Sequence, residues 1–464
     1  MKHILIVSGD TVDAKMGGVG IRNWEIAKSL AHDFDVTLAI PNTSDLTSSD
    51  FHLVSYDLEK GDLRPYATEA DVLVVHGFVL HFHPYLRELG KPLAVDLYVP
   101  SLLESLVWHD QDDWETWIPA YEEYVRVQQD LIRAGDFFFC ASERQRDYWL
   151  GWLHALKRIN PHTYRQDPSL RRLIDVVPFG LPDEPPQKNS PVLKGVFPGI
   201  GESDRVIIWS GGLWDWLDPL TLIQAMAVLA PQHPELKLFF MGTRHPNPVV
   251  SGMLMPDKAI DLSKKLDLFG KSVFFGDWVK YEERMGYLEE SDLAVISHPG
   301  HIETHFSFRT RVLDAIWSGL PIVITEGDAM AGWVENEHLG ATVPVGDAAA
   351  LARAIEAIFV QGGRPAFENS FRGMRDTLRW NRVVRPLVEF CQNPVCAPDK
   401  SMYLTQAERV ARDKDRFLEQ VVRDKDAFYQ AIIDDREAEI KRLRSMMIFK
   451  VALRIKRLLK GQFS

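Results

Sequence analysis

The sequence predicts an α/β protein with two doubly wound, parallel-sheet domains and a helical tail. Short, fully apolar runs alternate with amphipathic helical segments over most of the chain, which is typical of parallel sheets covered by helices. An apolar strand that ends at Ser-Gly occurs twice, as "KHILIVSGD" at the start and as "RVIIWSGG" from residue 205. After about residue 400 these runs stop and an 11-residue repeat begins.

The first domain is expected over 1–185. Its apolar runs show no polar alternation, so we interpret them as strands buried on both faces. They are "KHILIVSGD", "FDVTLAI", "ADVLVVHG", "KPLAVDLY", "GDFFFCAS" and "IDVVPFG". A proline-rich linker follows, which we place at 186–200.

The second domain is expected over 201–376, with a closing helix at 377–398 and the tail at 399–464. Its strands are predicted at "RVIIWSGG", "LKLFFMG", "KSVFFG", "DLAVISHPG" and "LPIVITEGD". Ligands of such sheets bind beyond the carboxyl ends of the strands. We therefore expect a cleft between the two domains.

Composition excludes several classes of protein. The 464 residues are 46% hydrophobic and 25% charged, as in ordinary globular proteins. No apolar run reaches 18 residues, so we expect no transmembrane helix, and the N-terminus does not resemble a signal peptide. The three cysteines match no metal spacing. We therefore expect a reduced, cytoplasmic protein. The net charge is −12, but 441–464 holds eight Lys/Arg and no acid, so the rest carries about −20, which disfavours nucleic acid as a partner.

Two glycine-rich turns are expected at the cleft. "GGVG", with Gly18, follows the first strand and opens a helix, where glycines let the backbone approach a phosphate and helix N–H groups can receive it. Gly211 and Gly212 occupy the corresponding place in the second domain. The dinucleotide fingerprint G-x-G-x-x-G is not matched. The alternative is that these turns only reverse the chain.

The stretch "HIETHFSFRTRVLDAIWSGLP" (301–321) predicts a helix over about 308–318, with Ser307 as N-cap and Gly319 at the stop. Arg309 and Arg311 then lie at its start, where the helix dipole normally favours acids. We expect them to bind a diphosphate, with Asp314 one turn further on a ribose diol. The donor-binding group predicted here is Ser307, Phe308, Arg309, Thr310, Arg311 and Asp314. The alternative is that the arginines pair with surface acids.

Three further groups are candidates in the second domain. Arg244 in "MGTRHPNP" is a second phosphate contact or a solvent-exposed loop residue. Trp278 in "FFGDWVKYEE" is a wall for a flat base or a packing residue. His301, Glu303 and His305 alternate, which admits a metal site, but no other cluster supports one, so we expect no metal and Glu303 facing a substrate hydroxyl.

His76, Asp96 and Tyr98 follow predicted strands of the first domain and are expected on its cleft side. Asp96 and Tyr98 are predicted to face the acceptor. His76 is a candidate catalytic residue, although a lone histidine in such a place is more often structural.

Residues 1 to about 395 resemble a glycosyltransferase of family 4, a retaining family with the GT-B fold. The matching features are "GGVGIRNWEIAKSLA", "WSGGLWDW" and "ETHFSFRTRVLDAIWSGLPIVIT", of which the last is the most specific. The resemblance implies a nucleoside-diphosphate sugar as donor, Asp314 as the ribose-binding acid and Glu303 as the acid that contacts the sugar. It also implies a variant subgroup that acts in surface polysaccharide or O-antigen assembly.

The sequence departs from that family's pattern. Glu303 lies eleven residues before Asp314 rather than eight, and Tyr98 stands nearest to the family's usual histidine. The usual Arg and Lys after the first strand of the second domain are absent from "GGLWDWLDP". We expect Arg309, Arg311 and Arg244 to compensate, since a diphosphate leaving group needs cations.

The tail predicts one long helix, because "RDKDRFLEQVV", "RDKDAFYQAII" and "DDREAEIKRLR" repeat every 11 residues. Its end, "MMIFKVALRIKRLLK", is apolar on one face and basic on the other. We expect 441–464 to bind an anionic membrane peripherally on the cytoplasmic side, with a lipid-linked glycan as acceptor. The second interpretation is a coiled coil over 404–447 that joins copies of the chain.

The predicted activity is therefore retaining, metal-independent hexosyl transfer without a cofactor, from a nucleotide sugar to an acceptor hydroxyl. Glu303, Arg309 and His76 are the catalytic candidates. Two alternatives stay open, a catalytically inert scaffold of the same fold and a nucleotide-sugar epimerase.

Overall fold

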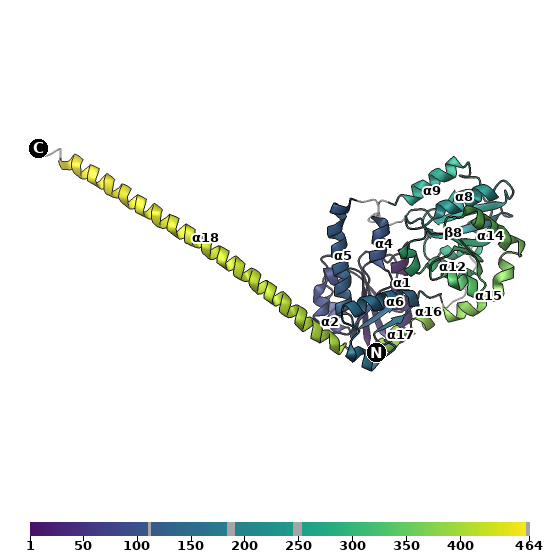
Figure 1. The fold of residues 1–464 in the computed structure, drawn as a ribbon, viewed down its shortest axis with the longest axis horizontal. Helices are drawn as coiled ribbons and strands as arrows, with labels where there is room; N and C mark the ends of the chain where they lie inside the picture. Colours follow the sequence, from purple (N-terminus) through teal and green to yellow (C-terminus); the bar gives the residue numbers. More distant parts are fainter. Residues whose placement is uncertain (110–112, 183–190, 245–252, 461–464) are drawn as a thin grey trace. The chain divides into compact units, whose positions relative to one another are not determined.

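The computed structural model describes residues 1–109, 113–182, 191–244 and 253–460. The chain divides into two compact units, Met1–Lys400 and Ser401–Ser464. The first unit contains two all-parallel sheets with helices around them (Figure 1). The strand order is β3-β2-β1-β4-β5-β6-β7 in one sheet and β10-β9-β8-β11-β12-β13 in the other. The predicted fold class is confirmed.

All eleven predicted apolar runs form strands. They are β1 (His3–Val7), β2 (Asp35–Ile40), β4 (Val72–His76), β5 (Leu93–Asp96), β6 (Phe137–Cys140), β7 (Ile174–Val176), β8 (Arg205–Gly212), β9 (Leu236–Gly242), β10 (Val273–Phe275), β11 (Leu293–Ile296) and β12 (Ile322–Thr325). Two strands were not predicted, β3 (His52–Ser55) and β13 (Gly340–Val343). Both lie at sheet edges and are partly exposed, so they lack an apolar run.

Helices follow most strands, as the alternation predicts. In the first domain they are α1 (Gly18–Leu30), α2 (Arg64–Glu69), α3 (Val79–Phe82), η1 (Pro84–Arg87), α4 (Ser101–Trp108), α5 (Trp114–Ala134), α6 (Glu143–Ala155) and α7 (Pro161–Gln166). In the second they are α8 (Pro219–Leu229), α9 (Met255–Lys265), α10 (Arg284–Glu289), α11 (Ile302–Phe306), α12 (Thr310–Ser318), α13 (Ala331–Asn336), α14 (Ala348–Val360) and α15 (Arg364–Thr377).

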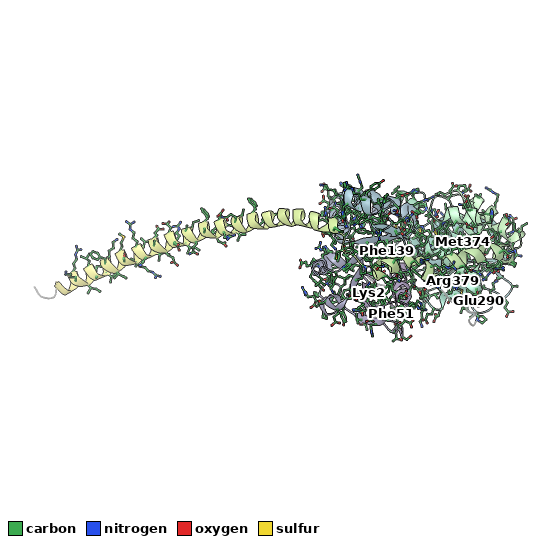
Figure 2. All side chains as sticks on the ribbon, turned by 90° about the horizontal axis from the view of Figure 1, so that it is seen from below. Lys2, Phe51, Phe139, Glu290, Met374 and Arg379 are labelled. Atoms are coloured by element: carbon green, nitrogen blue, oxygen red, sulfur yellow. The ribbon has the colours of Figure 1, made fainter. Side chains whose placement is uncertain are left out.

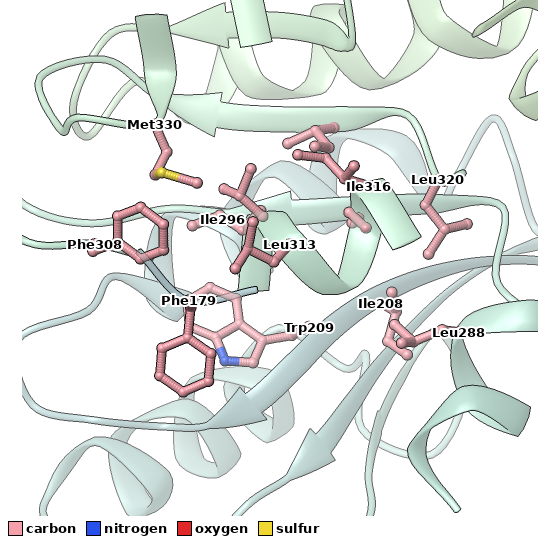
Figure 3. Packing of buried hydrophobic residues seen from close by; sticks show 14 of the residues in the cluster. Phe179, Ile208, Trp209, Leu288, Ile296, Phe308, Leu313, Ile316, Leu320 and Met330 are labelled. Atoms are coloured by element: carbon pink, nitrogen blue, oxygen red, sulfur yellow. The ribbon is translucent and has the colours of Figure 1, made fainter. Parts of the chain in front are cut away.

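The core of the second domain fixes the orientation of α12. Leu313 and Ile316 of this helix are buried beside Ile208 and Trp209 of β8 (Figure 3). Val312 is equally buried, so the apolar stripe that the spacing predicts is the face that packs on the sheet. The start of α12 is thereby held near the carboxyl end of β8.

The chain returns to the first domain after α15 as two short helices, α16 (Trp380–Val383) and α17 (Arg385–Gln392), rather than as one closing helix. Leu181 accepts a backbone hydrogen bond from Trp380 and donates one to Leu378. A Cβ on Gly180 would lie 2.6 Å from the Trp380 ring, so only glycine fits there. Two distant segments therefore lie side by side where the domains join.

The predicted linker is described only from residue 191; its first five residues lie outside the described residues. Its described part is held by Glu290, which is labelled in Figure 2. The Glu290 carboxylate accepts hydrogen bonds from the backbone N–H groups of Val192, Leu193 and Lys194. Lys194 also pairs with Asp292 at 2.8 Å, so the carboxylates of Glu290 and Asp292 both anchor this segment to the second domain.

The tail is one continuous helix, α18 (Pro398–Lys460), as the 11-residue repeat predicts. Within Ser401–Ser464 the described side chains are exposed, and the repeat places Phe417, Val421, Phe428 and Ile432 in register. None of the described helices combines the length and apolar character that crossing a membrane requires.

Candidate functional site

The first glycine turn is shaped by close backbone contacts. A Cβ on Gly20 would lie 2.3 Å from the carbonyl oxygen of Thr11, so no other residue fits without a shift. The helix α1 begins at Gly18, and its first turn carries no acidic residue. Its N–H groups are thus not neutralised by a neighbouring carboxylate from the same turn.

The second turn, at the end of β8, leaves room for two side chains. Gly211 has a φ of +116°, which favours glycine, and its Cβ position is 3.1 Å from Nε of Arg311. The Cβ position of Gly212 is 2.9 Å from the ring of Trp278. Both predicted glycines therefore allow a predicted site residue to approach the sheet.

These groups surround a cavity of about 140 Å³ between the two domains. The first domain contributes Gly18 and its neighbours, and the second contributes the ends of β8 and β9 and the start of α12. The structure brings together seven predicted residues here: Gly18, Gly211, Gly212, Trp278, Thr310, Arg311 and Asp314.

The start of α12 differs from the prediction. The helix begins at Thr310 with Arg309 in the N-cap position, and Ser307 instead ends the preceding short helix α11. The hydroxyl of Ser307 donates to the carbonyl of Thr304 at 3.0 Å, so it caps nothing in α12. Phe308 is buried against Trp333. The segment therefore folds as two short helices, and the N-cap prediction for Ser307 is wrong.

Arg309 forms a buried ion pair with Glu303, at 2.9 Å between Nη2 and Oε2. Glu303 is fully buried, and its Oε1 has no hydrogen-bond partner among the described residues; the same holds for Nε of Arg309. Nδ1 of His301 lies 3.5 Å from Oε2 of Glu303, and burial lowers the pKa of this histidine. His301 is therefore mostly neutral at pH 7, and Arg309 is the cation nearest Glu303.

Arg311 points from α12 back to the second glycine turn. It donates a hydrogen bond to the carbonyl of Gly212, and its guanidinium lies 4.8 Å from the centre of the Trp209 ring. Burial, reinforced by the charge of Arg309, lowers the pKa of Arg311 to about 9. A buried cation so disfavoured is stabilised by an anion placed next to it.

Asp314 is paired with a residue that the sequence did not suggest. Arg284 lies 3.2 Å from its carboxylate and stacks over the ring of Tyr281. Burial raises the pKa of Asp314, while the positive charges of Arg284 and Arg311 oppose that rise. Arg284 sits in the charge-rich stretch "KYEERMGYLEE", which resembles a solvated helix face, so no local signal marks it.

The domains contact each other around this cavity. The backbone N–H of Tyr281 donates to the carbonyl of Ala14 at 2.9 Å, and its hydroxyl donates to Glu25 at 2.8 Å. From α6, Arg144 donates to the carbonyl of Gly327 at 2.9 Å, and Gln145 donates to the carbonyl of Phe306 at 3.0 Å. Hydrogen bonds therefore connect the two domains that form the walls of the cavity.

Arg244 is not among the residues that line the cavity. Its side chain is 60% exposed and pairs with Asp257. A contact of Arg244 with a donor phosphate stays a prediction.

His76 and Asp96 have partners within the first domain. Nε2 of His76 accepts a hydrogen bond from the N–H of Gly9 at 2.9 Å and lies 3.0 Å from Nδ2 of Asn23; burial lowers its pKa. Asp96 accepts two hydrogen bonds from Arg22, at 2.6 and 3.1 Å. Their predicted roles toward a substrate stay predictions.

Tyr98 lies near the first glycine turn. Its hydroxyl is 3.8 Å from the Cβ position of Gly18, and its ring receives the guanidinium of Arg22 at 5.0 Å. Burial raises the pKa of Tyr98, so the hydroxyl stays protonated. It is a hydrogen-bond donor beside the first glycine turn.

No group of three His, Cys, Asp or Glu side chains in the described parts of the chain is arranged to hold a metal ion. This includes the alternating residues His301, Glu303 and His305. In the structure Glu303 pairs with Arg309, while His301 caps α11 by accepting a hydrogen bond from the N–H of Thr304.

Comparison with known proteins bears on the second domain and on the fold. Residues 204–360 match the family model described as glycosyl transferases group 1. This part of the chain is thus similar to glycosyl transferase group 1 domains. It holds every cavity residue that the second domain contributes, from β8 to α12. No curated protein matches the sequence.

Solved structures that match most of the chain have a similar fold. A sucrose-phosphate synthase from Thermosynechococcus elongatus is 16% identical, with a TM-score of 0.59 over 84% of this chain and 98% of that one. WaaG, a glycosyltransferase involved in lipopolysaccharide biosynthesis, is 15% identical with a TM-score of 0.57, over 84% and 100%. Anabaena Alr3699/HepE in complex with UDP-glucose is 14% identical with a TM-score of 0.59, over the same shares. The first unit thus has a GT-B fold, and the residues that match the family model lie in its second half.

Proposed function

We propose that the protein transfers a sugar from a nucleoside-diphosphate sugar to an acceptor hydroxyl, with retention of configuration and without a metal ion. The observation that carries this proposal is the cavity in which Arg311, the start of α12 and two glycine turns meet beside Asp314. Cations, backbone N–H groups and a carboxylate one turn apart suit a diphosphate joined to a ribose.

In this mechanism negative charge develops on the leaving diphosphate. Arg311 and the first N–H groups of α12 stabilise that charge, and Arg309 is the second cation at the same helix start. Glu303, held by Arg309 at 2.9 Å, orients the donor sugar. Asp314 binds the ribose, with Arg284 fixing its carboxylate.

Calorimetric titration with UDP and UDP-glucose tests the donor site, because the HepE structure holds UDP-glucose. We expect binding to the full-length protein and weaker binding to Arg311→Met, which keeps the volume of the side chain without its charge. Arg353→Met on the exposed face of α14 is the matched control. If UDP, UDP-glucose and other nucleoside diphosphates leave no heat, the chain is an inert scaffold.

We further propose a lipid-linked glycan as acceptor and peripheral attachment to an anionic, cytoplasmic membrane face. The basis is the amphipathic end of α18, where Lys450 and Arg454 lie one turn apart among exposed apolar residues. Each basic residue near such a surface contributes about 1 kcal/mol.

Flotation with phosphatidylserine-containing vesicles tests this attachment. The double variant Lys450→Glu/Arg454→Glu is expected to lose flotation, whereas Arg436→Glu, further up the same helix, is expected to float like the wild type. If the double variant floats as well as Arg436→Glu and the wild type, 441–464 is not a membrane anchor. Light-scattering mass measurement of the same proteins tests the second role, a coiled coil over 404–447.

A further inference from the structure

A second cavity lies in the first domain, between α4, α5 and the turn after β4. Its volume is about 390 Å³, enough for a monosaccharide ring. Phe78 and Tyr124 form one aromatic wall, with ring centres 5.3 Å apart in an edge-to-face arrangement. Ser101, Glu104 and Gln128 supply polar groups. Aromatic faces with a few polar groups are typical of sugar sites.

This cavity adjoins the pair of residues proposed to handle the donor sugar. The helix α4, which carries Glu104, packs against α11, which carries Glu303. Glu104 is close enough to Glu303 and Arg309 for their charges to act on it. A molecule in the cavity that touches Glu104 therefore lies next to the sugar end of the donor site rather than its nucleotide end.

Gln128 supplies an independent observation. Its side chain is 6% exposed and lines the cavity, and its Nε2 has no hydrogen-bond partner among the described residues. Burying such a donor without an acceptor is unfavourable, because its hydrogen bond to water is lost and not replaced. A hydroxyl oxygen in the cavity would accept from this amide, while the carboxylate of Glu104 would accept from a neighbouring hydroxyl.

We propose that this cavity is the acceptor subsite and that it binds a pyranose ring of the acceptor glycan. Gln128 donates to one ring hydroxyl, Glu104 accepts from another, and Phe78 and Tyr124 contact the ring. Glu104 and Gln128 are binding residues that position the acceptor hydroxyl toward the donor sugar. This inference rests on the proposed glycosyl transfer, but it involves no residue that lines the donor cavity.

Saturation-transfer NMR with the full-length protein, UDP and a panel of methyl hexopyranosides tests the proposal. We expect a methyl hexopyranoside signal in the wild type that is lost in Gln128→Leu and reduced in the near-isosteric Glu104→Gln, while the UDP signal persists in both. Glu122→Leu on the exposed side of α5 is the matched control and keeps both signals.

The outcomes separate the two proposals. A UDP signal together with no hexopyranoside signal, or with one that neither variant changes, overturns the acceptor subsite alone. No signal in the wild type from UDP or from any other nucleoside diphosphate overturns the proposed function. A UDP signal that persists in both variants also shows that they are folded, so a lost hexopyranoside signal then supports the subsite.

Discussion

The two domains share one architecture, but two of their buried polar clusters, around Arg22 in the first and around Arg309 in the second, differ in how far their hydrogen bonds are satisfied. In the first domain Arg22 makes three hydrogen bonds, two to Asp96 and one to the carbonyl of Val177, and a single nitrogen is left over. In the second domain Glu303, Arg309 and Arg311 each keep a buried polar atom without a partner among the described residues, within nine positions of the chain.

The difference separates scaffold from site. A buried polar atom without a partner costs on the order of 1–3 kcal/mol, so a cluster of them is retained only where something else is gained. The network around Arg22, in which three hydrogen bonds are made and one nitrogen is left over, stabilises the sheet of the first domain. The unsaturated cluster of the second domain suits a ligand rich in oxygen atoms. The experiments below test this distinction, from the largest expected effect to the smallest.

Breaking the first network should affect stability far more than donor binding. Arg22→Met leaves Asp96 buried without its partner, and such changes cost about 3–5 kcal/mol. Urea denaturation measures the loss, with Arg353→Met as control. UDP affinity, measured by calorimetry, should stay close to that of the wild type. A large loss of UDP affinity in a folded Arg22→Met protein would contradict the distinction.

Breaking the second cluster should affect turnover. Arg309→Ala removes a cation from the proposed leaving-group site, and we expect transfer from UDP-glucose, or from the donor identified by calorimetry, to fall about 10²–10³-fold. Because the change also leaves Glu303 unpaired, Arg309→Lys is measured beside it: it keeps the charge and should retain more activity. Equal rates for wild type and Arg309→Ala would remove Arg309 from the mechanism.

Glu104 lies on α4 of the first domain, close to Glu303 and Arg309 of the second. Its titration should make the free energy of unfolding depend on pH. Burial and the charge of Glu303 raise the pKa of Glu104 from 4.5 to about 7, while Arg309 opposes the rise. The folded protein then binds more protons than the unfolded chain between these pH values, so stability falls as pH rises through this window, by up to about 3 kcal/mol in total.

Glu104→Gln removes this titration. Relative to the wild type, the variant should gain stability at pH 8 and gain little at pH 5, as measured by urea denaturation at both values. A difference between the two proteins that stays the same at pH 5 and pH 8 would contradict the raised pKa of Glu104.

The smallest effect is expected at the first glycine turn. In Gly20→Ala the new methyl group would lie 2.3 Å from the carbonyl of Thr11, so the loop must shift, at a cost of about 1–3 kcal/mol. Gly151→Ala in α6, where a Cβ meets nothing within 4 Å, is the control and should be neutral or slightly stabilising. Thermal unfolding of both variants measures the difference.

The sequence predicted what depends on local pattern. Apolar runs gave eleven strands, and the spacing of Val312, Leu313 and Ile316 gave the buried face of α12. Edge strands β3 and β13 were missed because partial exposure leaves no apolar run. The start of α12 was misplaced because the hydroxyl of Ser307 serves the preceding turn instead.

Partners distant in sequence could not be predicted. Arg284 reaches Asp314 across 30 positions, and Arg22 reaches Asp96 across 74. Either pairing needs the sheet to bring two elements together, and nothing in the local sequence of Arg284 or Arg22 records it. The same holds for Glu104, whose role depends on α4 meeting α11 from the other domain.

The paired segments at Leu181 and Leu378 constrain how the two domains move. The backbone of Leu181 hydrogen-bonds to both Leu378 and Trp380, so the outgoing and the returning chain are fastened to each other at the junction. Two segments joined by backbone hydrogen bonds resist sliding past each other, whereas their backbone dihedral angles can still rotate. Sliding of one domain past the other would therefore break these two backbone hydrogen bonds, whereas rotation about the junction would leave them in place.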